Sequence, residues 1–162
     1  MNIEEINIGN ILRCTGPLCG EVEVAVDGVQ ASGKLRAHCV SAPGVCEMCR
    51  FHQNVQKFSA APITPAILTA SGFVYSACNG SFVMLQVGGR DNIIRVTPHG
   101  DLYDVEVFAS HPQLVITENS IKGVRYVHQL QNAYALATGG KLEIKVRKYE
   151  EQDLAYYPLL PT

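Results

Sequence analysis

Cysteines are the residues of this sequence best suited to chemistry: there are six, and five of them fall within the first 49 residues. Cys46 and Cys49 are separated by two residues, and such a pair can reach one metal ion from a single tight turn. Zinc in a structural site takes about four thiolate or imidazole ligands in a tetrahedron. We therefore expect a structural zinc site that contains Cys46 and Cys49.

Two ligand sets complete this site. One set follows the order of treble-clef and ribbon modules, a C-x4-C-G knuckle and then the C-x2-C pair: Cys14, Cys19, Cys46 and Cys49. The other set takes Cys39 together with the C-x2-C pair and adds one upstream cysteine, either Cys14 or Cys19. The spacing alone leaves both sets open.

Other groups near the cluster define the remaining alternatives. His38 and His52 are candidate imidazole ligands. An iron–sulfur cluster is the alternative to zinc, since C-x6-C-x2-C can also ligate iron. We interpret Cys78, which lies far from the cluster in sequence, as a small buried hydrophobic residue.

No set of catalytic residues accompanies the cysteines. Glu47 lacks the H-x-E or H-E-x-x-H context of a zinc-assisted base, and no G-x-S-x-G elbow or phosphate loop is present. We assign the scattered His99, His111 and His128 to turns and the surface. The chain is therefore not expected to be an enzyme.

Composition indicates a globular domain in a reducing compartment. Hydrophobic residues make up 47% of the chain and charged residues 17%, with a formal net charge of −2. The acidic start, MNIEEINIGN, does not resemble a signal peptide, and no apolar run is long enough to span a bilayer. Cysteines in such a chain favour metal binding over disulfides. We expect an intracellular, cytoplasmic protein.

Alternating and turn-rich segments predict a mainly β (α+β) fold. EVEVAVD at 21–27 alternates strictly, and Asp27-Gly28 is a turn dipeptide that leads into a returning strand. Further strands are expected at 73–78 and 81–87 around the turn Asn79-Gly80, and on both sides of the turn at 98–100.

Two helices and a final strand complete the expected domain at residues 1–149, with a zinc subdomain at about 12–58. Residues 47–58 space apolar side chains three or four apart, which is typical of a helix. A second helix is expected from a cap at Asn119 or Ser120 to Gly139-Gly140. KLEIKVRKY then alternates as a closing strand with a basic outer face. Residues 150–162 are expected to form a tail that is either loose or docked on a protein partner.

Aromatic and basic residues of the β region could bind a nucleic acid. Aromatic rings on an open sheet face stack bases, while cationic side chains hold phosphates. The candidates from the central strands and from the basic face of the closing strand are Tyr75, Phe82, Tyr103, Arg90, Arg95, Lys145 and Arg147. Ordinary core packing is the alternative interpretation of each aromatic residue.

The passage GKLRAHCVSAPGVCEMCRFHQNVQKFSAA, followed by FVYSAC and SFVMLQVGG, resembles the zinc-containing segment of single-stranded-DNA-binding proteins of tailed bacteriophages. The resemblance covers roughly residues 33 to 108, and Cys39, Cys46 and Cys49 match the ligand pattern. It implies an OB-type barrel with a zinc subdomain that binds single-stranded DNA. The spacing between the first two matched cysteines, Cys39 and Cys46, is shorter than in that family. The histidine ligand that lies upstream in those proteins has no clear equivalent in this sequence.

The sequence thus predicts an OB-like antiparallel barrel or sheet with a zinc-binding subdomain and one or two helices. Its predicted role is non-enzymatic binding of single-stranded nucleic acid, and homo-oligomerisation is left open. The alternative is a zinc-stabilised protein-interaction or assembly module, such as a viral one, whose apolar tail docks on a protein.

Overall fold

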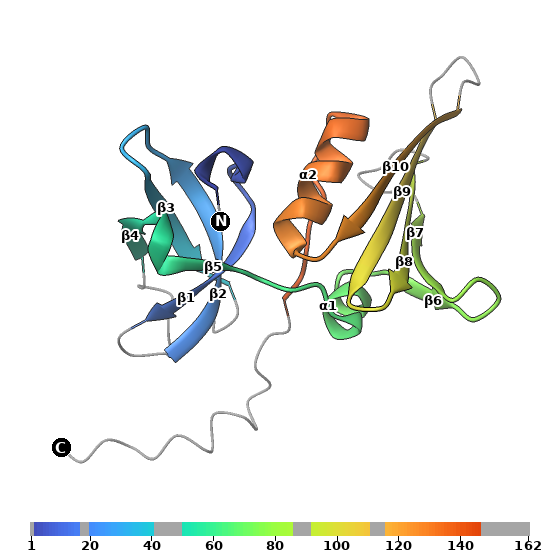
Figure 1. Ribbon diagram of the computed structural model, residues 1–162, viewed down its shortest axis with the longest axis horizontal. Helices are drawn as coiled ribbons and strands as arrows, with labels where there is room; N and C mark the ends of the chain where they lie inside the picture. Colours follow the sequence, from blue (N-terminus) through green and yellow to red (C-terminus); the bar gives the residue numbers. More distant parts are fainter. Residues whose placement is uncertain (1, 17–19, 41–49, 86–91, 111–115, 147–162) are drawn as a thin grey trace, which may run out of the picture.

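Two antiparallel sheets of five strands each form the protein in the computed structural model, which describes residues 2–16, 20–40, 50–85, 92–110 and 116–146 (Figure 1). The first sheet is built from residues before position 61, and the second from residues after position 73. Helix α2 lies between the two sheets (Figure 1). The prediction of a mainly β fold with antiparallel strands and helices is confirmed.

The first sheet has the strand order β4-β3-β2-β1-β5. Its elements, with the 3-10 turn η1 that precedes them, are η1 Ile3–Glu5, β1 Ile11–Gly16, β2 Gly20–Val29, β3 Lys34–Cys39, β4 Arg50–Asn54, η2 Val55–Lys57 and β5 Phe58–Ala60. The alternation of residues 21–27 is confirmed, since Val22, Val24 and Val26 are all buried. The expected turn at Asp27-Gly28 is wrong. The register shifts there instead, between Val26 and Gly28, and β2 continues to Val29.

A short connection forces the first sheet to curl. β4 and β5 lie at opposite edges of the sheet, yet only the three residues of η2 separate them in the chain. Four flat strand spacings span roughly 19 Å. The four chain steps from Asn54 to Phe58 reach at most roughly 14 Å. The sheet must therefore bend into a half-barrel.

The helix expected at residues 47–58 is wrong where the structure describes it, because the chain from Arg50 to Ala60 forms β4, η2 and β5. β4 pairs with β3 in continuous register, from Arg50 opposite His38 to Asn54 opposite Lys34. Phe51 and Phe58 are buried from these two strands. Strand pairing, and not a helix, therefore accounts for the burial of Phe51 and Phe58.

The second sheet is a meander, with the order β10-β9-β8-β7-β6. Its strands are β6 Val74–Ser76, β7 Ser81–Leu85, β8 Ile93–His99, β9 Leu102–Ser110 and β10 Ile116–Val124. The hairpins around Asn79-Gly80 and around the turn at 98–100 are confirmed. Because consecutive strands pair throughout, each residue's face of the sheet can be read from the register.

Both α-helices of the described residues pack on the inner face of the second sheet. α1 spans Pro65–Ala70 and is capped by the Thr64 hydroxyl, which accepts from the Ile67 amide. α2 spans Val127–Thr138 and ends at Gly139, whose φ of 67° suits glycine. The expected end of this helix is confirmed, but its expected start is wrong. Asn119 and Ser120 belong to β10.

The prediction of a closing strand that begins at Lys141 is wrong for its described part. Residues 141–146 have no strand partner among the described residues. Their burial does alternate as expected, with Leu142 and Val146 buried. The backbone of this segment forms hydrogen bonds with side chains instead of with a neighbouring strand. The Lys145 amide donates to Ser71 Oγ at 2.9 Å, and the Leu142 carbonyl accepts from Gln131 Nε2 at 3.4 Å.

Two hydrophobic cores follow from this arrangement. The first core lies on one face of the first sheet and contains Leu12, Cys14, Val22, Val24, Leu35, Phe51 and Phe58, among others. The second core packs α1, α2 and residues 142–146 against the second sheet. Ile11 belongs to the second core, with Ala25 and Val40 packed against it. The opposite face of the first sheet therefore contributes to the contact between the two halves.

An amide network joins the two halves where β1 meets α2. Gln131 Oε1 accepts from the Ile11 amide at 3.0 Å, and Gln131 Nε2 donates to the Gly9 carbonyl at 3.1 Å. Asn132 Oδ1 accepts from the side chains of Asn7 and Asn10, at 2.9 and 3.1 Å. Buried polar groups need such partners, so this network fixes how the halves meet.

We expect Gln131→Ala to lower the free energy of unfolding by about 1–3 kcal/mol or more, because it leaves the buried Ile11 amide without its acceptor. Urea unfolding followed by circular dichroism measures this change. Gln56→Ala is the matched control, since Gln56 is exposed on η2 and its loss should cost under about 0.5 kcal/mol. Equal costs for the two variants would contradict the role of the network.

Candidate functional site

The cysteine candidates are only partly described. Cys14 lies on β1 and is buried, whereas Cys39 ends β3 and is half-buried. Both belong to or contact the first core, so their side chains share one face of the sheet. Cys19, Cys46 and Cys49 lie outside the described residues.

The strand ends that flank these cysteines point to the same end of the first sheet. Gly16, the end of β1, is opposite Gly20, the start of β2. His38, one residue before the end of β3, is opposite Arg50, the start of β4. Because neighbouring strands are antiparallel, all four ends point to one end of the sheet, and β3 ends opposite Val24, four residues from Gly20. Cys39 lies here, and so do Gly20 and Arg50, the residues that directly follow Cys19 and Cys49 in the chain.

The register separates Cys14 from Cys39. Cys14 is opposite Val22, and Cys39 is opposite Val24 on the other side of β2. Two strand spacings and two residues amount to roughly 12 Å between their Cα atoms. Two thiolates on one zinc have sulfurs no more than about 4.6 Å apart. This geometry favours ligand sets that contain either Cys14 or Cys39, but not both.

Cys14 has the character of a neutral core residue. Burial raises the pKa of its thiol, and the Sγ atom lies 3.9 Å from the Thr15 carbonyl. Among the described residues, no three His, Cys, Asp or Glu side chains are grouped closely enough to hold a metal ion. The described donors therefore form at most part of a metal site.

The structure changes the interpretation of two residues, Cys78 and His38. Cys78, expected to be buried, is exposed after β6, where the chain turns towards β7. His38, a candidate imidazole ligand, is engaged elsewhere: its Nδ1 lies 2.7 Å from Asp27 Oδ1 on an exposed part of the first sheet. His52 lies on β4, but its side chain is outside the described part of the structure.

The candidate nucleic-acid residues divide between the two faces of the second sheet. Phe82 is buried and Tyr103 half-buried on the inner face, and burial raises the pKa of Tyr103. Tyr75 is 56% exposed and its ring centroid lies 5.1 Å from that of Phe82. Arg95 is on the outer face, where it contacts Glu106 Oε2 at 3.1 Å. The structure thus brings Tyr75 and Phe82 together and places Arg95 on the other side.

Arg95 is already engaged by its neighbours. Besides the Glu106 contact, its guanidinium carbon lies 5.3 Å from the centroid of the Phe108 ring. Arg90 and Arg147 lie outside the described residues. Lys145 is described, and it lines a cleft away from these strands.

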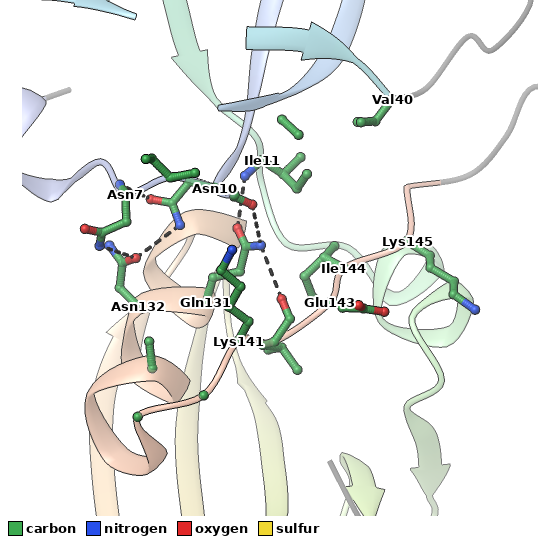
Figure 2. A pocket seen from close by; sticks show the side chains of 17 residues that line it. Asn7, Asn10, Ile11, Val40, Gln131, Asn132, Lys141, Glu143, Ile144 and Lys145 are labelled. Carbon is green, nitrogen blue, oxygen red and sulfur yellow. Dashed lines mark hydrogen bonds between the residues drawn. The ribbon is translucent and has the colours of Figure 1, made fainter. Parts of the chain in front are cut away.

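An open cleft of about 670 Å³ lies between the two halves (Figure 2). Two distant parts of the sequence line it. One is residues 7–11 together with Ala25 of β2 and Val40, and the other runs from Gln131 in α2 to Lys145. Sequence reasoning missed this cleft. The alternation of residues 141–146 was the available signal, because it separated an apolar face from a charged one.

The cleft combines apolar and charged groups. Lys141, Glu143 and Lys145 are exposed and alternate with the buried Leu142 and the half-buried Ile144. A Cβ atom placed on Gly9 would lie 3.9 Å from Lys141 Nζ, so this ammonium group reaches back to the first half. The amide groups of Gln131 and Asn132 are occupied by the network. The lysine ammonium groups are thus the main cationic groups that can meet a ligand there.

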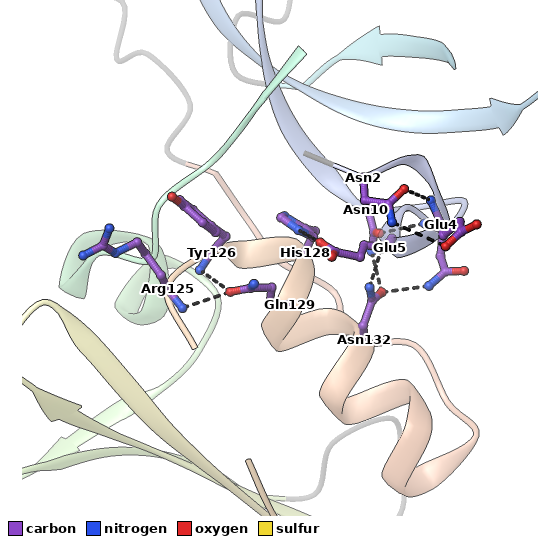
Figure 3. Close-up of polar contacts among 10 residues, drawn as sticks. Asn2, Glu4, Glu5, Asn10, Arg125, Tyr126, His128, Gln129 and Asn132 are labelled. Carbon is purple, nitrogen blue, oxygen red and sulfur yellow. Dashed lines mark hydrogen bonds and ion pairs between the residues drawn. The ribbon is translucent and has the colours of Figure 1, made fainter. Parts of the chain in front are cut away.

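His128 is a buried histidine that the sequence had assigned to the surface. It lies in the first turn of α2, is 1% exposed, and stacks on Tyr126 with ring centroids 5.9 Å apart (Figure 3). Neither ring nitrogen has a hydrogen-bond partner among the described residues, and Glu5 Oε2 lies 4.0 Å from Nε2. Desolvation by burial lowers the pKa of His128, partly opposed by the Glu5 charge.

Acid should therefore weaken the fold. Above the ordinary histidine pKa of about 6.5, His128 is neutral in both the folded and the unfolded chain. Below it, the unfolded chain takes up a proton that folded His128 resists, so the free energy of unfolding falls by up to about 1.4 kcal/mol per pH unit. Urea unfolding between pH 7.5 and 5 measures this slope.

Two variants test the assignment to His128. His128→Phe should flatten this part of the pH dependence, whereas His99→Asn, at an exposed strand end, should leave it unchanged. A His128→Phe variant that loses stability in acid as steeply as the unaltered chain would contradict the assignment.

Neither α1 nor α2, the α-helices of the described residues, has the length and apolar character of a transmembrane helix. No protein-family model, no curated protein and no solved structure matches the chain. The function must therefore be inferred from the chain's own sequence and geometry.

Proposed function

We propose that the chain is a zinc-stabilised protein that binds single-stranded nucleic acid without catalysing a reaction, and that the strand lies in the cleft between the two halves. The observation that carries this proposal is the lining segment 139–145. It places the exposed Lys141 and Lys145 along one side of a cleft with an apolar floor.

The cleft has the groups that such binding requires. Single-stranded nucleic acids are held by cations along the backbone and by surfaces on which bases stack. Lys141 and Lys145 supply the positive charge, and the exposed Glu143 between them offsets part of it. Ile8, which is 59% exposed, and the half-buried Val40 and Ile144 supply apolar surface. The outer face of the second sheet fits less well, because Glu106 neutralises Arg95 there.

We propose the OB-like barrel as the finer description of the first sheet. The support is its curl, which follows from the three-residue connection between edge strands β4 and β5. A partly open five-stranded barrel is the form in which OB-type domains bind single strands.

We further propose that zinc binds at the end of the first sheet where β1, β2, β3 and β4 have their connections. Cys39 would be the described ligand, with Cys46, Cys49 and Cys19 from the connecting segments. The support is that Cys39, Gly20 and Arg50 lie at the same end of the sheet, and that the register keeps Cys14 away from Cys39. The alternative set replaces Cys39 with Cys14.

Salt-dependent binding to a labelled oligonucleotide tests the nucleic-acid proposal. The double variant Lys141→Gln/Lys145→Gln should bind more weakly, and the slope of log K against log salt should fall by about 1.4, or roughly 0.7 per lost phosphate contact. Lys34→Gln/Lys57→Gln removes the same charge from exposed positions outside the cleft and should keep the slope. Absence of binding by the unaltered chain even at low salt would refute the proposal.

Metal analysis and thermal unfolding test the zinc proposal. The chain should carry one zinc per molecule, and Cys46→Ser or Cys49→Ser should remove the metal and lower the melting temperature. Cys78→Ser is the matched control, because Cys78 is exposed in the second half of the chain.

The remaining cysteine variants separate the two ligand sets. Cys39→Ser loses zinc under the proposed set, and Cys14→Ser loses it under the alternative. A purified chain without stoichiometric metal would refute both sets.

The second candidate is a protein-interaction or assembly module. Exposed aliphatic side chains on the second sheet, Val74 and Leu85, favour it, at 71% and 65% exposure. Under this alternative, the oligonucleotide experiment gives no binding at any salt concentration.

A further inference from the structure

The outer face of the second sheet carries an apolar patch without a cover among the described residues. The strand register places Val74, Val83 and Arg95 in one row across this face, and Leu85, Ile93 and Phe108 in the next. Val74 and Leu85 are among the most exposed large hydrophobic residues of the described chain. We call Val74, Val83, Leu85, Ile93 and Phe108 the outer patch.

Two charged side chains described beside the outer patch, Arg95 and Asp104, already have partners. Arg95 contacts Glu106 and lies over the Phe108 ring, and Asp104 accepts from the Gly123 amide at 3.4 Å. An occupant held by strong ionic contacts would need unpaired charges of one sign on this face. The patch therefore suits an apolar segment, which gains free energy by removing aliphatic surface from water.

The described chain ends near the β6 edge of the second sheet. The Lys145 amide donates to Ser71 Oγ at 2.9 Å, and the Ser71 hydroxyl also donates to the Ile67 carbonyl at 2.7 Å. Ser71 precedes Val74, the first residue of β6, by three positions, and β6 is an edge strand of the sheet. The chain that follows Val146 thus starts beside the edge that borders the outer patch.

The sequence after this point has the length and composition for the outer patch. Sixteen residues, 147–162, follow Val146, and an extended chain of this length reaches roughly 50 Å. Its last nine residues are mostly apolar: Leu154, Ala155, Tyr156, Tyr157, Pro158, Leu159, Leu160, Pro161 and Thr162. Pro158 and Pro161 lack an amide donor, so this segment suits packing on a face or an edge better than a central strand.

We propose that residues 154–161 fold back on their own chain and cover the outer patch around Val74 and Leu85. This contact is intramolecular, so its strength does not depend on protein concentration. It is independent of the nucleic-acid proposal, because the outer patch shares no residue with the cleft.

Limited proteolysis of the full chain tests this contact. Chymotrypsin cleaves after tyrosine and leucine, and a covered tail is cut only when it is released, so the rate follows the released fraction. Val74→Asp/Leu85→Asp should speed removal of the tail by roughly tenfold, equivalent to about 1.4 kcal/mol of lost contact. Leu136→Asp, at a residue of α2 that is 85% exposed, is the matched control and should leave the rate unchanged.

A reciprocal variant guards against a general loss of folding. Leu159→Asp/Leu160→Asp changes no strand residue of either sheet and should increase hydrogen exchange at β6 and β7, while β1 and β2 keep their protection. Equal cleavage rates in all variants, or unchanged exchange in the tail variant, would overturn the proposal. A concentration-dependent dimer that Leu85→Asp dissociates would also overturn it, because a second copy would then occupy the outer patch.

Discussion

The hydrogen bonds from Gln131 and Asn132 to residues 5–11 are the interaction on which the rest of the structure depends. Each half has its own core, and the two sheets share no strand. Without directional contacts, the apolar surfaces of Ile11 and α2 would meet in many orientations. The amides select one orientation because each has a specific backbone or side-chain partner. The cleft and the buried position of His128 both exist only in that orientation.

Strands that show their pattern locally could be predicted from the sequence. β2 alternates strictly, and the β6–β7 hairpin has an Asn-Gly turn. A helix was wrongly predicted at residues 47–58 because Phe51, Val55 and Phe58 have helical spacing. Short apolar segments do not distinguish a helix from a strand by periodicity alone. Its true structure depends on the pairing of Phe51 with Ala37 of β3. The same holds for residues 141–146, whose backbone partners are side chains of Ser71 and Gln131.

The candidate site was predictable only as far as its chemistry is local. The C-x2-C pair is visible in the sequence, and the register adds that Cys14 and Cys39 lie too far apart to bind the same ion. The cleft was not predictable, because its lining comes from distant parts of the sequence that meet only after α2 packs. Which aromatic and basic candidates share a face was not predictable for a similar reason. Phe82 and Arg95 are both on strands, and only the pairing shows that they face opposite sides.

The curl of the first sheet also has a consequence for solubility. An unpaired strand edge can recruit another chain and start aggregation. Bringing β4 and β5 near one another leaves little room for a foreign strand on that sheet. The second sheet keeps two separate borders, at β6 and β10. β6 is only three residues long, and β10 is interrupted by a register shift beside Lys122, so neither border is a long regular template.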